Sequence, residues 1–97
     1  MANVVVGSAA AADLAELILT HSLPPDTPER VARVLARLEV FPDMGQRLSG
    51  RWEGTRYVVG PWPWMLVVYE HHPQLERVEV LTIQDARAST AATFSGR

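Results

Sequence analysis

The apolar run Trp64-Met65-Leu66-Val67-Val68-Tyr69 sets the architecture of this chain, because both of its alternating faces are hydrophobic. Such a strand is buried on both sides of a sheet. Two further runs rich in β-branched residues, Thr55–Val59 and Arg77–Ile83, flank it, and turn-forming Gly, Pro and His residues separate the three. The sequence therefore predicts a three-stranded antiparallel meander with Trp64–Tyr69 at its centre.

The part of the chain before this meander predicts one strand and two helices. Asn3–Val6 is a short β-branched run that ends at Gly7. Ala9–Ser22 repeats apolar residues at helical spacing, and Thr27-Pro28 is a start signal for a second amphipathic helix. A short Pro-rich link joins the two helices, so they are expected to pair antiparallel. The order of elements predicts an α+β fold, with a small antiparallel sheet of about four strands and an N-terminal helical hairpin on one face.

The second face of the central strand needs a cover, because the helix pair can bury only one side of the sheet. One candidate is the C-terminal tail with Phe94, and the other is a partner chain. Two tryptophans on either side of Pro63 are difficult to bury in a hairpin turn, and large aromatic side chains are typical anchors of protein interfaces. The predicted partner surface consists of Trp62, Trp64, Leu66 and Val68.

Composition restricts the class of protein. The chain has 97 residues, which we expect to form a single domain over 1–97, with 88–97 as a flexible tail. No apolar run is long enough to span a bilayer, and there is no cysteine, so we expect a soluble cytoplasmic protein without a membrane partner. A net charge of -2 argues against coating nucleic acid through bulk positive charge, although a local basic site is compatible with it.

Short motifs after the second predicted helix follow one another in a characteristic order. They are Phe41-Pro42-Asp43-Met44-Gly45, Leu48-Ser49-Gly50, Gly54-Thr55-Arg56, Leu66-Val67-Val68-Tyr69, Val78–Ile83 and Asp85-Ala86-Arg87. This order resembles the RelE/ParE superfamily of toxins from bacterial type II toxin-antitoxin systems, over roughly residues 3 to 88. The resemblance implies a compact sheet with a helical hairpin and a cognate antitoxin that wraps the toxin.

The resemblance also implies one of two modes of action. RelE-like members cleave messenger RNA on the ribosome, and ParE-like members poison DNA gyrase. Arg56 and Arg87 match arginines of the family and are candidate catalytic residues that would hold a phosphate. The alternative for each is a surface arginine paired with a carboxylate such as Glu53 or Asp85.

Departures from the RelE pattern favour the ParE-like mode. The strand position where RelE-like nucleases often carry a second cation is Trp64 or Met65 here, and the usual terminal tyrosine has no match. Tyr69 ends an apolar strand and is expected in the core. We therefore expect a toxin that inhibits growth by binding DNA gyrase, with a ribosome-dependent endonuclease and a non-toxic protein-binding relative as alternatives.

The most basic and aromatic stretch contains candidate contacts to a target or to nucleic acid, namely Arg47, Arg51 and Trp52. The alternative is a solvated loop with Trp52 packed against the helices. His71 and His72 are expected in a solvated turn, and the three histidines lack the spacing of metal ligands, so neither a metal nor another cofactor is expected. Sequence-specific DNA binding by the chain alone is not expected either.

Overall fold

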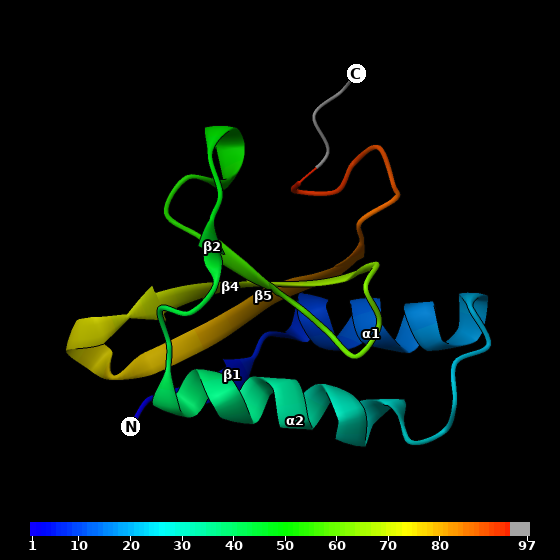
Figure 1. Cartoon of the computed structure of the whole chain (residues 1–97), viewed down its shortest axis with the longest axis horizontal. Helices are drawn as coiled ribbons and strands as arrows, with labels where there is room; N and C mark the ends of the chain where they lie inside the picture. Colours follow the sequence, from blue (N-terminus) through cyan, green and yellow to red (C-terminus); the bar gives the residue numbers. More distant parts are fainter. Residues whose placement is uncertain (94–97) are drawn as a thin grey trace.

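The computed structural model describes residues 1–93, which form a sheet with two helices on one side (Figure 1). Its elements are β1 Asn3–Val6, α1 Ser8–Thr20, α2 Thr27–Val40, β2 Gln46–Arg47, β3 Arg56–Val59, β4 Met65–His72 and β5 Arg77–Asp85, with single 3-10 turns η1 Gly50–Trp52 and η2 Pro73–Leu75. The strand order is β1-β5-β4-β3-β2; β1 is parallel to β5, and the other pairs are antiparallel. The α+β prediction is confirmed.

The predicted number of strands was too low, because the sheet has five strands and not four. The additional strand, β2, is two residues long, and both of its residues are exposed. It pairs with the first half of β3 through Gln46 opposite Tyr57 and Arg47 opposite Arg56. A strand this short and this polar shows no hydrophobic alternation, so its sequence does not distinguish it from a loop.

The prediction that His71 and His72 lie in a turn was also wrong. β4 continues through both residues, which pair with Val78 and Arg77 of β5. The turn itself is η2, and Glu76 closes it in the left-handed backbone conformation at φ 47°. Strand pairing with β5 therefore overrides the weak strand propensity of the two histidines, and it points them to opposite faces of the sheet.

The helical hairpin packs as its apolar stripes predict. α2 buries Val31, Val34 and Leu38. α1 lies along the end of β5 that β1 leaves unpaired, where Asp13 accepts hydrogen bonds from the Thr82 hydroxyl at 2.6 Å and from the Ile83 amide at 3.3 Å. Thus α1 satisfies a backbone donor at the sheet edge.

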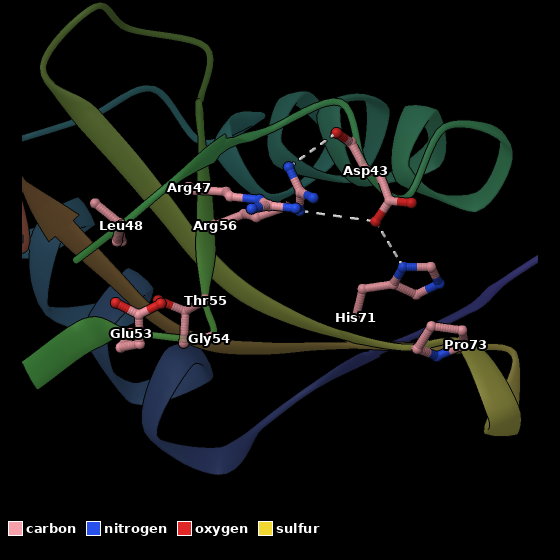
Figure 2. A pocket seen from close by; sticks show the side chains of 9 residues that line it. All are labelled: Asp43, Arg47, Leu48, Glu53, Gly54, Thr55, Arg56, His71 and Pro73. Atoms are coloured by element: carbon pink, nitrogen blue, oxygen red, sulfur yellow. Dashed lines mark hydrogen bonds and ion pairs between the residues drawn. The ribbon is translucent and has the colours of Figure 1, made fainter.

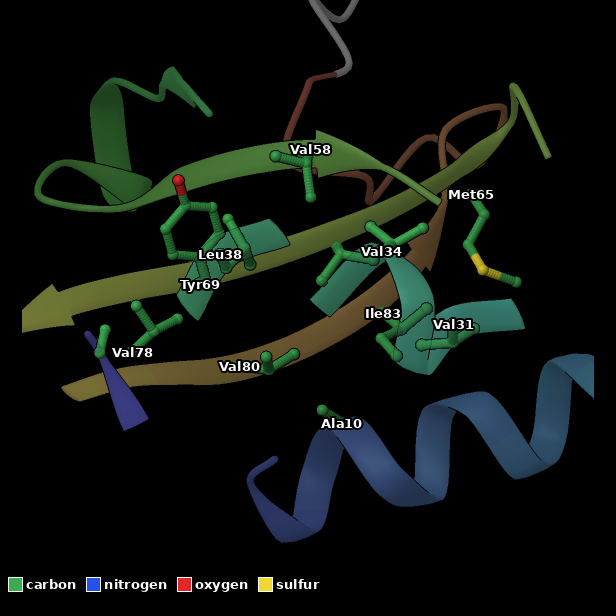
Figure 3. Close-up of a cluster of buried hydrophobic side chains, with 12 residues drawn as sticks. Ala10, Val31, Val34, Leu38, Val58, Met65, Tyr69, Val78, Val80 and Ile83 are labelled. Atoms are coloured by element: carbon green, nitrogen blue, oxygen red, sulfur yellow. The ribbon is translucent and has the colours of Figure 1, made fainter. Parts of the chain in front are cut away.

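The core lies between the helices and the alternate residues of β4 that point toward them (Figure 3). Met65, Val67 and Tyr69 are fully buried there, which confirms the prediction for Tyr69. Of these three residues, Tyr69 is the nearest to the C-terminal end of β4, and its hydroxyl bonds Pro42 and Gly45 in the turn after α2. It therefore links the core to that turn.

The opposite face of β4 is covered within the single chain. Leu66 and Val68 are 3% and 0% exposed. The segments after β2 and after β5 lie on this side, away from the helices (Figure 1), and each contributes a buried apolar residue, Leu48 and Ala91 respectively. The Ala92 amide donates to the side chain of Gln84, the β5 residue opposite Leu66. The tail thus supplies cover as one of the two alternatives predicted, although Phe94 lies outside the described residues.

Candidate functional site

A polar cleft of about 340 Å³ lies where the turn after α2 meets β2, β3 and the end of β4 (Figure 2). Its walls are formed by Asp43, Arg47, Leu48, Glu53, Gly54, Thr55, Arg56, His71 and Pro73. Three of these side chains, Arg47, Arg56 and His71, can carry positive charge. The cleft therefore combines cations with two carboxylates in a chain whose net charge is negative.

Tyr69 fixes the turn that forms one wall. Its buried hydroxyl donates to the Pro42 carbonyl at 2.8 Å and accepts from the Gly45 amide at 2.9 Å. Burial raises the pKa of Tyr69 above its ordinary value, so the hydroxyl stays protonated and acts as a structural anchor. Gly45 is required at this close approach, because a Cβ there would lie 2.7 Å from both the Tyr57 carbonyl oxygen and the Tyr69 hydroxyl.

Arg56 is a fixed cation. Its guanidinium donates to the carbonyls of Gly45 at 2.9 Å and Asp43 at 3.3 Å, and its Nε lies 3.7 Å from the Asp43 carboxylate. Arg47 lies directly opposite Arg56 in the β2–β3 ladder and is exposed, and its side chain has no hydrogen bond or ion pair to another residue between 1 and 93. One arginine thus holds its charge in place, while the other is free to meet a ligand.

His71 completes the cleft. Its Nδ1 lies 2.7 Å from Asp43 Oδ1, and its side chain is only 15% exposed. If Nδ1 carries the proton donated to Asp43, Nε2 is left as a proton acceptor, and Nε2 has no partner within the described part of the chain. The sequence predicted His71 in a solvated turn and did not place it among the site residues. The sequence feature that could have identified His71 is its position two residues beyond Tyr69 on the same strand, because this spacing places both side chains on one face.

Arg87 does not join Arg56. Arg56 is opposite Tyr69, whereas Asp85 at the end of β5 is opposite Met65, so four strand residues, about 13 Å, separate the two positions along β4. Arg87 instead donates two hydrogen bonds of 2.8 Å to Asp85. These bonds hold the pKa of Asp85 well below its usual range. The sequence offered Asp85 as an alternative partner for a surface arginine, and Asp85 is the partner of Arg87 in the structure.

The tryptophans of the predicted partner surface belong to a stacked cluster at this far end. Trp64 stacks on His21 with ring centroids 4.6 Å apart, and the Arg87 guanidinium lies 4.9 Å from the Trp64 ring. Trp62 lies 6.3 Å from Trp64, and both rings are partly buried against the core. Antitoxin binding at these residues stays a prediction. For Leu66 and Val68 it requires the covering segments to move, because both side chains are buried.

Arg51 and Trp52 lie in η1, next to the cleft residue Glu53. The Arg51 guanidinium lies 5.7 Å from the Trp52 ring, and Arg51 is exposed while Trp52 is half-buried. The pair offers a charged, aromatic surface beside the cleft. Its role as a target contact stays a prediction, as does that of Arg47.

No protein-family model and no curated protein matches this chain. Solved structures resemble it in fold. A chain of the toxin-antitoxin complex RelBE2 from Mycobacterium tuberculosis is 21% identical, with a TM-score of 0.60, over 87% of this chain and 96% of its own. YafQ from Escherichia coli is 11% identical, with a TM-score of 0.61, over 94% and 100%. A conserved hypothetical protein from Helicobacter pylori is 16% identical, with a TM-score of 0.58, over 88% and 94%.

At these identities the comparison establishes the fold, which is RelE-like, as the sequence resemblance implied. The match covers 94% to 100% of the length of these similar chains. Neither helix of this fold is long and apolar enough to cross a membrane.

Proposed function

We propose that this chain is the toxin of a toxin-antitoxin pair and that it cleaves RNA in the cleft between the turn after α2 and strands β2, β3 and β4. The observation that carries this proposal is the arrangement of His71, bound through Nδ1 to Asp43, beside Arg47 and Arg56. The RelE-like fold supports the toxin assignment, since one of the similar chains comes from a toxin-antitoxin complex. An antitoxin is accordingly the partner we expect.

The cleft contains the groups needed to cut a phosphodiester bond next to a ribose 2′-hydroxyl. His71 Nε2 accepts the 2′-hydroxyl proton while the 2′-oxygen forms a bond to the adjacent phosphorus. The bond from phosphorus to the 5′-oxygen breaks, and that oxygen takes a proton from water. The products are a 2′,3′-cyclic phosphate and a 5′-hydroxyl. Arg47 and Arg56 stabilise the negative charge that develops on the phosphoryl oxygens.

Asp43 has a positioning role in this scheme. It orients the imidazole through Nδ1 and stabilises the imidazolium that forms when Nε2 takes up a proton. Arg56 lies close enough to the same carboxylate to limit its movement, since Arg56 Nε is 3.7 Å from Asp43 Oδ1. The turn held by Tyr69 therefore aligns the base and one of the cations together.

This proposal changes the order of the two modes of action expected from sequence. Gyrase poisoning was favoured because the second strand cation and the terminal tyrosine of RelE-like nucleases had no match. The cleft offers different residues for those tasks, with Arg47 as a second cation and His71 as a proton acceptor. RNA cleavage is therefore the function that this geometry supports best, and gyrase poisoning becomes an outcome that the experiment must separate from it.

The test is controlled expression in a bacterial host that lacks the antitoxin. We expect the wild-type chain to arrest growth and to fragment messenger RNA. His71→Ala should abolish the arrest, because loss of a general base costs about 10²- to 10⁴-fold in rate. His21→Ala is the matched control, since it removes a histidine that also contacts an aspartate but lies at the far end of β4. It should leave toxicity unchanged.

Two results would overturn the proposal. A DNA-damage response with intact messenger RNA would indicate gyrase poisoning, and harmless accumulation of folded wild-type protein would indicate a non-toxic relative. Circular dichroism of each purified variant establishes that it is folded, so that loss of toxicity can be assigned to the cleft.

A further inference from the structure

A second group of titratable side chains lies on the face of β4 opposite to His71. Glu70 and His72 alternate with Tyr69 and His71 along the strand, so they point to the other side of the sheet, and Glu79 joins them from β5. One potential ligand atom from each of the three residues lies within 4.8 Å of the others. The group is separate from the cleft and takes no part in the proposed RNA chemistry.

The two carboxylates of this group face each other across the sheet. Glu70 and Glu79 are directly opposite in the β4–β5 ladder, and like charges in that position destabilise a sheet. No arginine forms an ion pair with either glutamate within the described residues, including Arg77, which lies opposite His72. Within the described residues the two negative charges therefore lie together with no arginine to compensate them, and His72 is the one side chain that pairs with both.

His72 points its Nε2 atom at both carboxylates. Nε2 lies 3.1 Å from Glu70 Oε1 and 3.9 Å from Glu79 Oε1. Although this nitrogen is buried, it has no hydrogen bond of acceptable geometry to any residue from 1 to 93. A buried nitrogen without a hydrogen bond is costly, and a metal ion bound to its lone pair would satisfy it. The same ion would remove the repulsion between the two glutamates.

We propose that Glu70, His72 and Glu79 bind a divalent transition-metal ion of the zinc class. Two ligands that are each about 2.1 Å from a tetrahedral ion lie about 3.4 Å apart, close to the separations observed around His72 Nε2. One imidazole and two carboxylates suit Zn²⁺ better than Mg²⁺, which prefers oxygen ligands alone. Three protein ligands leave a fourth position for water.

The ion would connect the end of β4 to β5 beside the η2 turn. Glu70 and His72 are spaced Glu-x-His on one strand, and Glu79 lies directly opposite Glu70 on the next. A search for the helical spacing His-x-x-x-His does not detect this pattern of ligands. Binding of zinc by this group would overturn the expectation from sequence that the histidines of this chain lack a metal partner.

The test is calorimetric titration of untagged, metal-free full-length protein with Zn²⁺, followed by thermal unfolding with and without the ion. We expect one ion per chain and a higher unfolding temperature in its presence. His72→Ala and Glu79→Gln should each weaken binding at least tenfold. His21→Ala and Glu76→Gln are matched controls, which change a histidine and a glutamate outside the group and should bind as the wild type does.

Glu79→Gln keeps the size of the side chain, so it tests ligation even if His72→Ala fails to fold. The proposal is overturned if the wild type does not bind zinc at millimolar concentration, or if His72→Ala and Glu79→Gln bind it as tightly as the controls. Equal stabilisation by Mg²⁺ would indicate general neutralisation of surface carboxylates and would also overturn it.

Discussion

Tyr69 illustrates how a single residue connects the core to the cleft. Its ring is buried beside α2, and its hydroxyl bonds both Pro42 and Gly45 in the turn that includes Asp43. Tyr69→Phe leaves two backbone groups without that partner, so we expect a loss of about 1 to 3 kcal/mol in the free energy of unfolding, measured by urea denaturation. Toxicity should fall with it, because the turn that orients His71 is loosened.

Tyr57→Phe is the control for this change, because among the described residues the Tyr57 hydroxyl bonds only the exposed Gln46 side chain, at 2.7 Å. We expect it to cost less than Tyr69→Phe. Equal effects of the two substitutions would mean that the Tyr69 hydroxyl does not hold the turn.

The Asp85 carboxylate predicts how stability depends on pH. Hydrogen bonds from Arg87, and a contact with His21, hold the pKa of Asp85 below its ordinary value in the folded state. The ionised Asp85 therefore contributes its full stabilisation of the fold above the pKa of an unfolded aspartate, about 3.9. This contribution is lost as the pH falls from there toward the pKa of Asp85 in the folded state. Wild type and Asp85→Asn should differ most in unfolding temperature at pH 5, and the difference should narrow by pH 2.

Glu16→Gln, which removes a negative charge from the surface of α1, controls for the change in net charge. A constant difference between wild type and Asp85→Asn over this pH range would show that the ion pair does not contribute.

At the scale of elements, the segment after β5 is expected to stabilise the sheet. This segment lies on the side of the sheet that carries Leu66 and Val68, and its residue Ala91 is buried. A chain that ends at Arg87 should lose about 1 to 3 kcal/mol of stability, because partial exposure of two apolar side chains is worth that much. A chain that ends at Thr93 is the control. Equal thermal stability of the two truncated chains would mean that the loop after β2 covers this face without the tail.

The same scale shows which elements can be predicted from sequence. Both helices and the three strands of the predicted meander have periodic apolar residues, and the pattern of Trp64–Tyr69 correctly predicted a strand buried on both faces. β2 could not be predicted, since two polar residues carry no period. The end of β4 was missed because its strand character comes from pairing with β5 and not from the propensity of His71 and His72.

The site was less predictable than the fold, because its members meet only in three dimensions. Sequence placed Arg47 and Arg56 among the candidates, and the β2–β3 ladder brings them together. It could not show that Asp43 binds His71 across 28 positions of the chain. It did offer Asp85 as an alternative partner of Arg87, which is the pairing observed, but it could not show that this pair lies at the other end of β4 from Arg56.

At the scale of the whole molecule, the distribution of charge matters more than its sum. The net charge is -2, yet Arg47 and Arg56 lie side by side in the cleft. Binding of RNA should therefore depend on this one cleft. We expect Arg47→Ala to weaken toxicity strongly, whereas Arg33→Ala on the exposed side of α2, which also removes one positive charge, should not. Equal effects would indicate that only total charge matters.

The most direct test of the account is the chemistry of the RNA ends made in cells that express this chain. If the cleft cuts RNA through the 2′-hydroxyl, sequencing of RNA termini should find new fragments with 5′-hydroxyl and 2′,3′-cyclic phosphate ends. These ends should be abundant with wild type and with His21→Ala, and absent with His71→Ala. Growth arrest without new ends, or the same ends from His71→Ala, would contradict the assignment of this cleft as a ribonuclease site.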